Sequence, residues 1–217
     1  MKNLMLKERK LAASPLSYLF IAFAAMTMIP GYPILVGSWF VCLGLFYSFQ
    51  SARENNDILY TVLLPIPKTD TVKAKFAFCV RIELISFAVM AALTVLRMTA
   101  LKEAAPYVTN VMMPANPVYL AFVLLIFTAF NTLFLGGFFK TGYVIGKPFI
   151  VFLIVGMLLV GVGETLHHLP WFAVLKATDT RSLLIQCGAL AAAAGLYALL
   201  SLSAYSRSKK RFEELDL

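Results

Sequence analysis

Residues 118–139 read VYLAFVLLIFTAFNTLFLGGFF and contain no charged side chain. Asn116 and Pro117 stand directly before this run, and asparagine at the N-cap followed by proline at the first helical position is typical of a helix start. At about 1.5 Å per residue, a helix of this length is about 33 Å long, enough to cross a hydrocarbon core of about 30 Å. The stretch therefore predicts a membrane-spanning helix.

The composition of the whole chain also indicates a membrane protein. Of 217 residues, 60% are hydrophobic and 14% are charged, and the mean hydropathy is +0.81. Soluble domains are about 45–50% apolar and about 25% charged, so this chain has too few polar residues to cover a water-soluble fold. At about 20 residues per span, the apolar residues supply roughly six spans and leave no second, soluble domain. We expect an all-α integral membrane protein in which residues 1–217 form a single transmembrane domain.

Five further apolar runs accompany the first. Proline and glycine at residues 30, 31 and 33 predict a turn, so residues 16–49 are interpreted as a hairpin of two short helices. The six predicted spans are 16–29, 34–49, 76–96, 118–139, 149–163 and 182–204.

The distribution of lysine and arginine predicts the orientation of these spans. One side of the six spans collects 14 of these residues and the other side collects four, while Arg81 falls within the third span. Basic residues concentrate in cytoplasmic loops, so we expect both termini and residues 53–75 to face the cytoplasm. The net charge of +8 is explained by topology and does not indicate nucleic-acid binding.

Several chemistries lack their sequence signals. The nearest approach to a phosphate-binding loop is at residues 142–148, where the spacing is wrong and Pro148 replaces the hydroxyl residue. The three cysteines lie singly in apolar runs, which favours neither a disulfide framework nor a zinc site. We therefore expect no catalytic residue, no bound metal and no cofactor in this chain.

The stretch between the second and third spans, residues 53–75, reads RENNDILYTVLLPIPKTDTVKAK. Its first part predicts a short helix over residues 57–64 that lies along the membrane surface, because its apolar residues share one face and its acidic and amide residues, including Glu54 and Asn56, gather at the N-terminal end. Pro65 and Pro67 end this helix, and Thr69 or Asp70 can begin the next one. A solvated loop remains the alternative interpretation.

The chain resembles the membrane subunit of ABC-type exporters of the second permease class, in particular its small, stand-alone bacterial members with six spans. The resemblance rests on the short basic segment 1–10, on NDILY at 56–60, on LPIPKTD at 64–70, and on Val72 and the pair at 75–76. It departs from the family at Pro67, where a hydroxyl residue is usual. In that family this loop is the coupling element for a separate ATPase, which implies coupling roles for Glu54, Asn56, Asp57, Ile58, Leu59, Val62 and Leu63.

The resemblance implies a permease subunit of an ATP-driven exporter that forms the translocation path. Its partners would be two copies of an ATP-binding subunit, which hold the ATP and Mg²⁺, and a second permease, identical or homologous. One alternative is the substrate-capturing membrane subunit of a vitamin importer, which would need a polar pocket facing outward. Another is an intramembrane enzyme, which would need clusters of acidic or histidine residues within its spans.

Three polar residues stand out within the predicted spans. Arg81 and Glu83 would lie about 7.5 and 10 Å into the third span, so Arg81 can extend to the membrane surface more easily than Glu83. Residues two apart project to nearly opposite sides of a helix, so these two are poor partners for each other. Glu83 is interpreted either as an interhelical hydrogen-bonding residue or as part of the translocation path. Asn131 in the fourth span is interpreted as an interhelical hydrogen-bonding residue and a further candidate for the path.

Two weaker patterns complete the sequence. Glu164, His167 and His168 lie before the sixth span without a zinc-binding motif, in a segment that predicts a short amphipathic helix at the outer face. The small-xxx-small pattern allows close approach of helix backbones. It occurs at 188–192 and 191–195 in the sixth span and at 44–48 in the second.

Overall fold

The chain folds as a bundle of long helices in the computed structural model, which describes residues 2–215. Its α-helices are α1 (Lys2–Lys7), α2 (Pro15–Leu19), α3 (Val36–Glu54), α4 (Asp57–Val62), α5 (Lys68–Thr99), α6 (Ala105–Val108), α7 (Pro117–Ala129), α8 (Gly136–Phe138), α9 (Gly146–Leu166) and α10 (Thr180–Glu213). Two segments are wound as π-helix, η1 (Glu8–Ala12) and η3 (Phe130–Leu135). Two are 3₁₀-helices, η2 (Phe20–Met28) and η4 (Pro170–Leu175). The described residues contain no strand, so the all-α prediction is confirmed.

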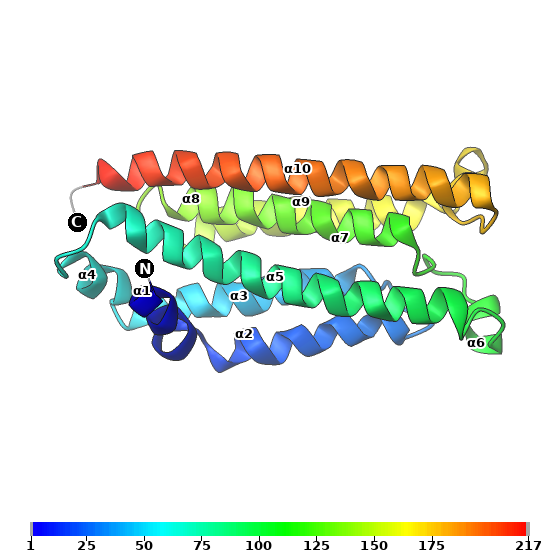
Figure 1. Cartoon of the computed structure of the whole chain (residues 1–217), viewed down its shortest axis with the longest axis horizontal. Coiled ribbons are helices and arrows are strands. Elements are labelled where there is room, and N and C mark those ends of the chain that lie inside the picture. The colour runs from blue at the N-terminus through cyan, green and yellow to red at the C-terminus, as the bar shows by residue number, and fades with distance from the viewer. Residues whose placement is uncertain (1, 216–217) are drawn as a thin grey trace.

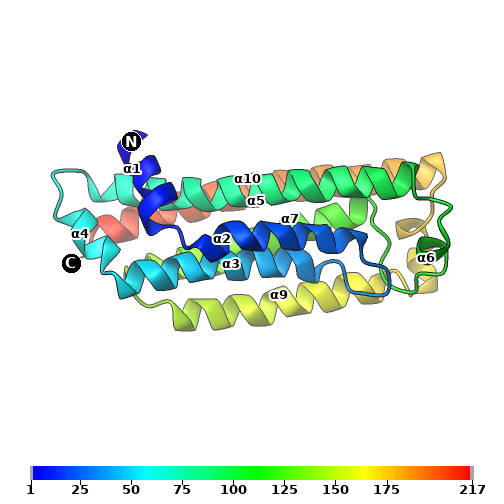
Figure 2. The same cartoon turned by 90° about the horizontal axis from the view of Figure 1, so that it is seen from below.

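The long helices lie side by side and divide the molecule into two ends. Figure 1 shows α7, α9 and α10 along one edge, with α2, α3 and α5 along the other. The two ends of the described chain and α4 lie at the same end of the bundle, whereas α6 and η4 lie at the opposite end. In Figure 2, α9 forms one edge and α2 lies against α3 along its length. Both chain ends on one side are what an even number of crossings requires.

Helices occupy all six predicted spans, but they differ in length and polarity. Among the described residues, four helices are long and apolar enough to cross a membrane: 68–99, 117–138, 146–166 and 180–213. A fifth candidate is the pair 3–10 and 15–28, which is bent by 85°. The helix α3 covers the predicted second span but also continues into Gln50, Ser51, Arg53 and Glu54, which lowers its average hydropathy.

The continuous helical stretch Pro117–Phe138 is the centre of the bundle. Its most apolar window is 78% buried, against 28% for α9 and 17% for α10. Aromatic side chains fill the space around it, with Phe134 within 5.8 Å, centroid to centroid, of Phe46, Phe49, Phe130 and Phe149. The outer faces of α9 and α10 expose large apolar side chains, among them Ile150, Ile154, Leu158, Leu184 and Leu199. An apolar outer surface of this kind fits a lipid solvent better than water.

Of three helix ends compared with their predicted positions, one agrees and two differ. Asn116 Oδ1 accepts a hydrogen bond of 3.0 Å from Tyr119 N, so the predicted N-cap is confirmed. The helix α4 ends at Val62, two residues before the predicted end at Leu64, because Pro65 disfavours helical geometry in the residue that precedes it. The helix α5 begins at Lys68, before both predicted starting residues, which places Asp70 in its first turn.

Candidate functional site

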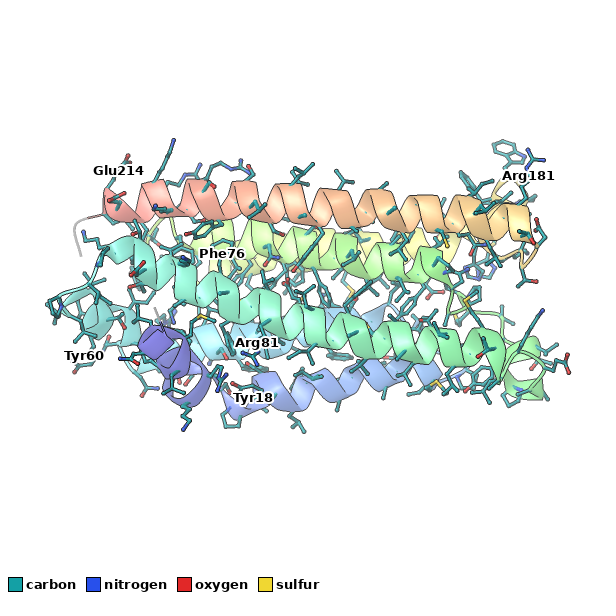
Figure 3. The ribbon with its side chains drawn as sticks, in the orientation of Figure 1. Tyr18, Tyr60, Phe76, Arg81, Arg181 and Glu214 are labelled. Atoms are coloured by element: carbon teal, nitrogen blue, oxygen red, sulfur yellow. The ribbon has the colours of Figure 1, made fainter. Side chains whose placement is uncertain are left out.

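The helix α4 presents two different sides. It lies at the end of the bundle where Tyr60 and Glu214 are labelled in Figure 3. Ile58 is 9% exposed and packs into the core of this chain, and Val62 is partly buried against the same core. Leu59 and Leu63 are 48% and 75% exposed. The predicted four-residue apolar face is therefore divided, and only Leu59 and Leu63 are open to a partner, next to the exposed Tyr60.

Four charged side chains hold the buried side of α4 in place. Lys7 Nζ lies 2.7 Å from Asp57 Oδ1 and 3.1 Å from Glu8 Oε1. Lys75 Nζ lies 3.0 Å from Asp57 Oδ2 and 3.0 Å from Glu8 Oε2. We call these four residues the ionic network; it contains two positive and two negative charges and joins α1, η1, α4 and α5. Glu8 and Lys75 are almost completely buried, so each needs its opposite charge nearby.

The carboxyl group of Asp57 responds to this environment. Burial favours the neutral form and works to raise its pKa, but attraction from Lys75 and hydrogen bonds from Lys7 and Lys75 outweigh that effect. The pKa of Asp57 therefore lies below its ordinary value. The carboxylate stays charged in the folded state, which keeps the ionic network complete near neutral pH.

The turn that leads into α4 depends on Asn56. Its backbone has φ of 52° and ψ of 29°, a left-handed conformation that asparagine tolerates better than most residues. A pocket of about 230 Å³ opens beside it, lined by Arg53, Ile58 and Leu59 together with residues of the α8–α9 connection such as Tyr143. Glu54 is exposed at the end of α3 and accepts a 3.1 Å hydrogen bond from Gln50 Nε2.

A second polar group lies in the middle of the bundle. Glu83 on α5 is fully buried, and its Oε2 accepts hydrogen bonds from Tyr197 Oη at 2.7 Å and Asn131 Nδ2 at 2.9 Å. Asn131 Nδ2 also lies 3.1 Å from Ser201 Oγ. We call these four residues the Glu83 cluster; it joins α5, the π-helical segment η3 and α10. Glu83 Oε1 and Asn131 Oδ1 have no hydrogen-bond partner among the described residues.

Arg81 and Glu83 differ as their positions predict. The side chain of Arg81 is exposed on the surface of α5 (Figure 3), whereas Glu83 points into the bundle. None of the ion pairs among the described residues joins them. An interhelical hydrogen bond was predicted for Glu83 and for Asn131. The bond from Asn131 Nδ2 to Glu83 Oε2 fulfils both predictions.

Glu164, near the end of α9, and His167, directly after α9, contact the segment between α6 and α7. Glu164 Oε2 accepts a 3.0 Å hydrogen bond from Met113 N, and His167 Nε2 lies 3.0 Å from Val111 O. The short 3₁₀-helix η4 follows, with Trp171 almost fully exposed. Glu164 and His167 thus bind backbone atoms of the segment between α6 and α7 rather than one another.

Several residues of these two groups were not identified from sequence. Glu8 and Lys75 belong to stretches that read as a basic surface segment and the entrance of a span, and nothing in their local spacing connects them. Tyr197 and Ser201 are four residues apart in α10, so they share a face of the helix. Two polar side chains on one face of an apolar helix were a signal that sequence reasoning could have used.

The comparisons with known proteins agree with this architecture. The sequence profile of the ABC-2 family transporter proteins matches residues 1–206. The chain therefore belongs to the ABC-2 transporter family, and it is a membrane protein of the transporter class rather than a catalytic subunit. No curated protein and no solved structure matches the chain significantly.

Proposed function

We propose that this chain is the permease subunit of an ATP-driven exporter in the bacterial plasma membrane. Six helical spans cross the bilayer, both termini and α4 face the cytoplasm, and the functional unit contains two permeases and two copies of a separate ATP-binding subunit. ATP and Mg²⁺ bind to that partner. This chain supplies the membrane element that alternates between two conformations. The free energy that favours one conformation over the other comes from the ATP-binding subunit.

The observation that carries the proposal is the combination of exposed leucines and buried charges on α4. Leu59 and Leu63 offer an apolar contact at the end of the bundle, while Asp57 in the same short helix is paired with Lys75 on α5. A partner that moves α4 therefore moves α5 through a buried ion pair. The helix α5 runs from this contact through the bundle as a single 32-residue element.

The Glu83 cluster supports a role for α5 in transport. Glu83 is two turns beyond Lys75 on the same helix, and its hydrogen bonds reach η3 and α10. A buried carboxyl group in a membrane span is costly, and such residues commonly mark transport paths. A displacement of α5 changes the contacts of Glu83 with Asn131 and Tyr197, which makes Glu83 and Asn131 the candidates for the translocation path.

Co-purification tests the coupling contact directly. The chain is co-expressed with a soluble ATP-binding subunit of the ABC type, and Leu59 and Leu63 are replaced together by alanine. An interface anchor commonly contributes 2 kcal/mol or more, so we expect the affinity for the ATPase to fall by about thirtyfold or more. The yield of co-purified ATPase and its hydrolysis rate are measured on the same samples.

A matched control separates this contact from a general loss of apolar surface. Leu184 and Leu199 on α10 are 70% and 69% exposed, yet they lie on the outer face of the bundle away from α4. The Leu184→Ala/Leu199→Ala variant should keep the ATPase bound. An unchanged ATPase yield in the Leu59→Ala/Leu63→Ala variant, with unchanged stimulation of hydrolysis, would place the coupling contact elsewhere.

A further inference from the structure

A basic groove opens between α8, α9 and α10 at the end of the bundle that also carries α4. It has a volume of about 540 Å³, which lies within the usual range for ligand sites. Four positive side chains line it: Lys140, Lys147, Arg207 and Arg211. No acidic residue is among the lining residues, and within residues 2–215 none of the four enters an ion pair. Four unneutralised cations around one groove favour an anionic ligand.

The lining residues other than the four cations do not favour a small soluble anion. Its other lining residues are the apolar Leu133, Val144 and Val151, together with Thr132, Thr141, Gly136, Gly137 and Pro148. The groove therefore has one charged part and one apolar part. A ligand that satisfies both parts is amphiphilic.

The position of the groove relative to the predicted spans indicates how such a ligand enters. Leu133 and Val151 lie inside the predicted spans 118–139 and 149–163. Lys140 and Lys147 lie just outside those spans, and Arg207 and Arg211 follow the predicted end of the last span at residue 204. The apolar part is thus at the depth of acyl chains and the cations are at the depth of phosphate groups.

The floor of the groove is built by a close helix contact. A Cβ atom placed on Gly137 would come within 2.8 Å of Pro148 Cβ, so glycine is what allows α8 to approach the start of α9. This contact places Lys140, which follows α8, and Lys147, in the first turn of α9, at the same opening. Arg207 and Arg211, near the C-terminal end of α10, complete the four cations, and α10 runs alongside α8 (Figure 1).

We propose that this groove binds an anionic phospholipid of the adjacent leaflet, with its phosphate groups at the four cations and an acyl chain along Leu133 and Val151. Basic pockets between membrane helices at the cytoplasmic surface recognise lipid headgroups by this chemistry. A headgroup with two phosphates neutralises more of the four charges than a headgroup with one. Cardiolipin is therefore the preferred probe, and phosphatidylglycerol should bind more weakly.

Binding is measured on the purified full-length chain in detergent, by native mass spectrometry and by the rise in unfolding temperature as lipid is added. The test variant Lys140→Gln/Arg207→Gln removes two groove cations. The control variant Lys209→Gln/Lys210→Gln removes two exposed cations of α10 that do not line the groove. In the proposed site only the groove cations contact the phosphate groups, so we expect cardiolipin affinity to fall about tenfold or more in the test variant and less than about twofold in the control.

The outcomes separate the lipid site from its alternatives. Equal weakening in both variants would show that only the overall positive charge matters and would overturn the proposal. Unchanged cardiolipin binding in the test variant would also overturn it. Inorganic pyrophosphate that raises the unfolding temperature as much as cardiolipin would show a site for soluble anions and would refute the lipid. If Lys140→Gln/Arg207→Gln does not fold, Lys147→Gln/Arg211→Gln removes the other two groove cations and is judged by the same results.

Discussion

The ionic network and the Glu83 cluster are two buried polar groups that share the helix α5, and they offset the cost of burial differently. In the ionic network, Lys7 and Lys75 face Glu8 and Asp57, so every charge has an opposite charge within 3.1 Å. In the Glu83 cluster, one carboxyl group accepts hydrogen bonds from the neutral groups of Asn131 and Tyr197, and Asn131 in turn donates to Ser201. The first group is complete within itself, whereas the second retains two oxygen atoms without a partner among the described residues.

This difference indicates that the ionic network connects helices, whereas the Glu83 cluster can exchange hydrogen-bond partners. A balanced group of ion pairs is strongly perturbed when one partner is removed, because the remaining charges stay buried. A carboxyl group with spare hydrogen-bonding capacity is able to gain or lose partners as helices move. We therefore expect the ionic network to transmit motion from α4 to α5, and the Glu83 cluster to respond to that motion. The following predictions test this comparison.

The largest expected effect is on Lys75. Replacing it by methionine leaves Glu8 buried with Lys7 as its only remaining cation among the described residues. Removing one partner of a buried ion pair typically costs about 3–5 kcal/mol, so we expect the free energy of unfolding in detergent to fall by about 3 kcal/mol. The control is Lys73→Met, because Lys73 is exposed one half-turn earlier. Equal losses in the two variants would show that the ionic network does not stabilise the fold.

A smaller loss is expected from Tyr197→Phe. This change removes the 2.7 Å hydrogen bond to Glu83 Oε2 without changing the ring. Interhelical hydrogen bonds in membrane proteins average about 0.6 kcal/mol and reach about 1.7 kcal/mol, so we expect a loss of about 1 kcal/mol in the free energy of unfolding. Tyr205→Phe on the same helix is the control, since its hydroxyl group makes no hydrogen bond among the described residues. A loss as large as that of Lys75→Met would contradict the comparison.

Acidification should weaken the ionic network through Asp57. Its pKa is lower in the folded chain than in the unfolded chain, so its contribution to stability is fully present above the unfolded pKa of about 3.9. That contribution is lost as the pH falls through the lower, folded pKa. The difference in unfolding temperature between the wild type and Asp57→Asn, measured from pH 7 down to pH 3, should begin to shrink as the pH falls below about 3.9. A difference that stays constant over this range would show that Asp57 is not charged in the folded state.

The smallest effect is expected at Arg81. Its side chain is exposed, so Arg81→Gln should change the free energy of unfolding by less than about 0.5 kcal/mol.

In vesicle export assays at matched expression, we expect charge reversal at Glu83 to reduce transport more than charge reversal at Arg81. Equal losses, or a larger loss at Arg81, would overturn the assignment of Glu83 to the translocation path.

Local sequence pattern predicted the helices better than it predicted their contacts. The start of α7 at Asn116 and Pro117, the exposure of Arg81 and the burial of Glu83 all follow from features within a few residues. The close packing predicted for residues 44–48 is present at Gly44, whose added Cβ would lie 2.5 Å from Phe20 Cβ. At Gly188 and Gly195 no atom of the described residues lies within 4 Å of an added Cβ, so at these two glycines the same pattern produces no close contact with that part of the chain.

The contacts that sequence reasoning missed join residues far apart in the chain. Lys75 and Glu8 are separated by 67 positions, and Tyr197 and Glu83 by 114. Helical periodicity shows which side of a helix is apolar, but it does not show which neighbour covers that side. For this reason Ile58 could not be distinguished from Leu59 before the structure placed one residue inside and the other outside.

The positions of the two polar groups along the chain also set the order in which they can form during synthesis. The last member of the ionic network to be made is Lys75, so this network can close when little more than a third of the chain exists. The last member of the Glu83 cluster is Ser201. At about 5–20 residues per second, roughly 6–25 s pass between these two events. During that interval the ionic network can already be closed, while Glu83 still lacks its partners from η3 and α10.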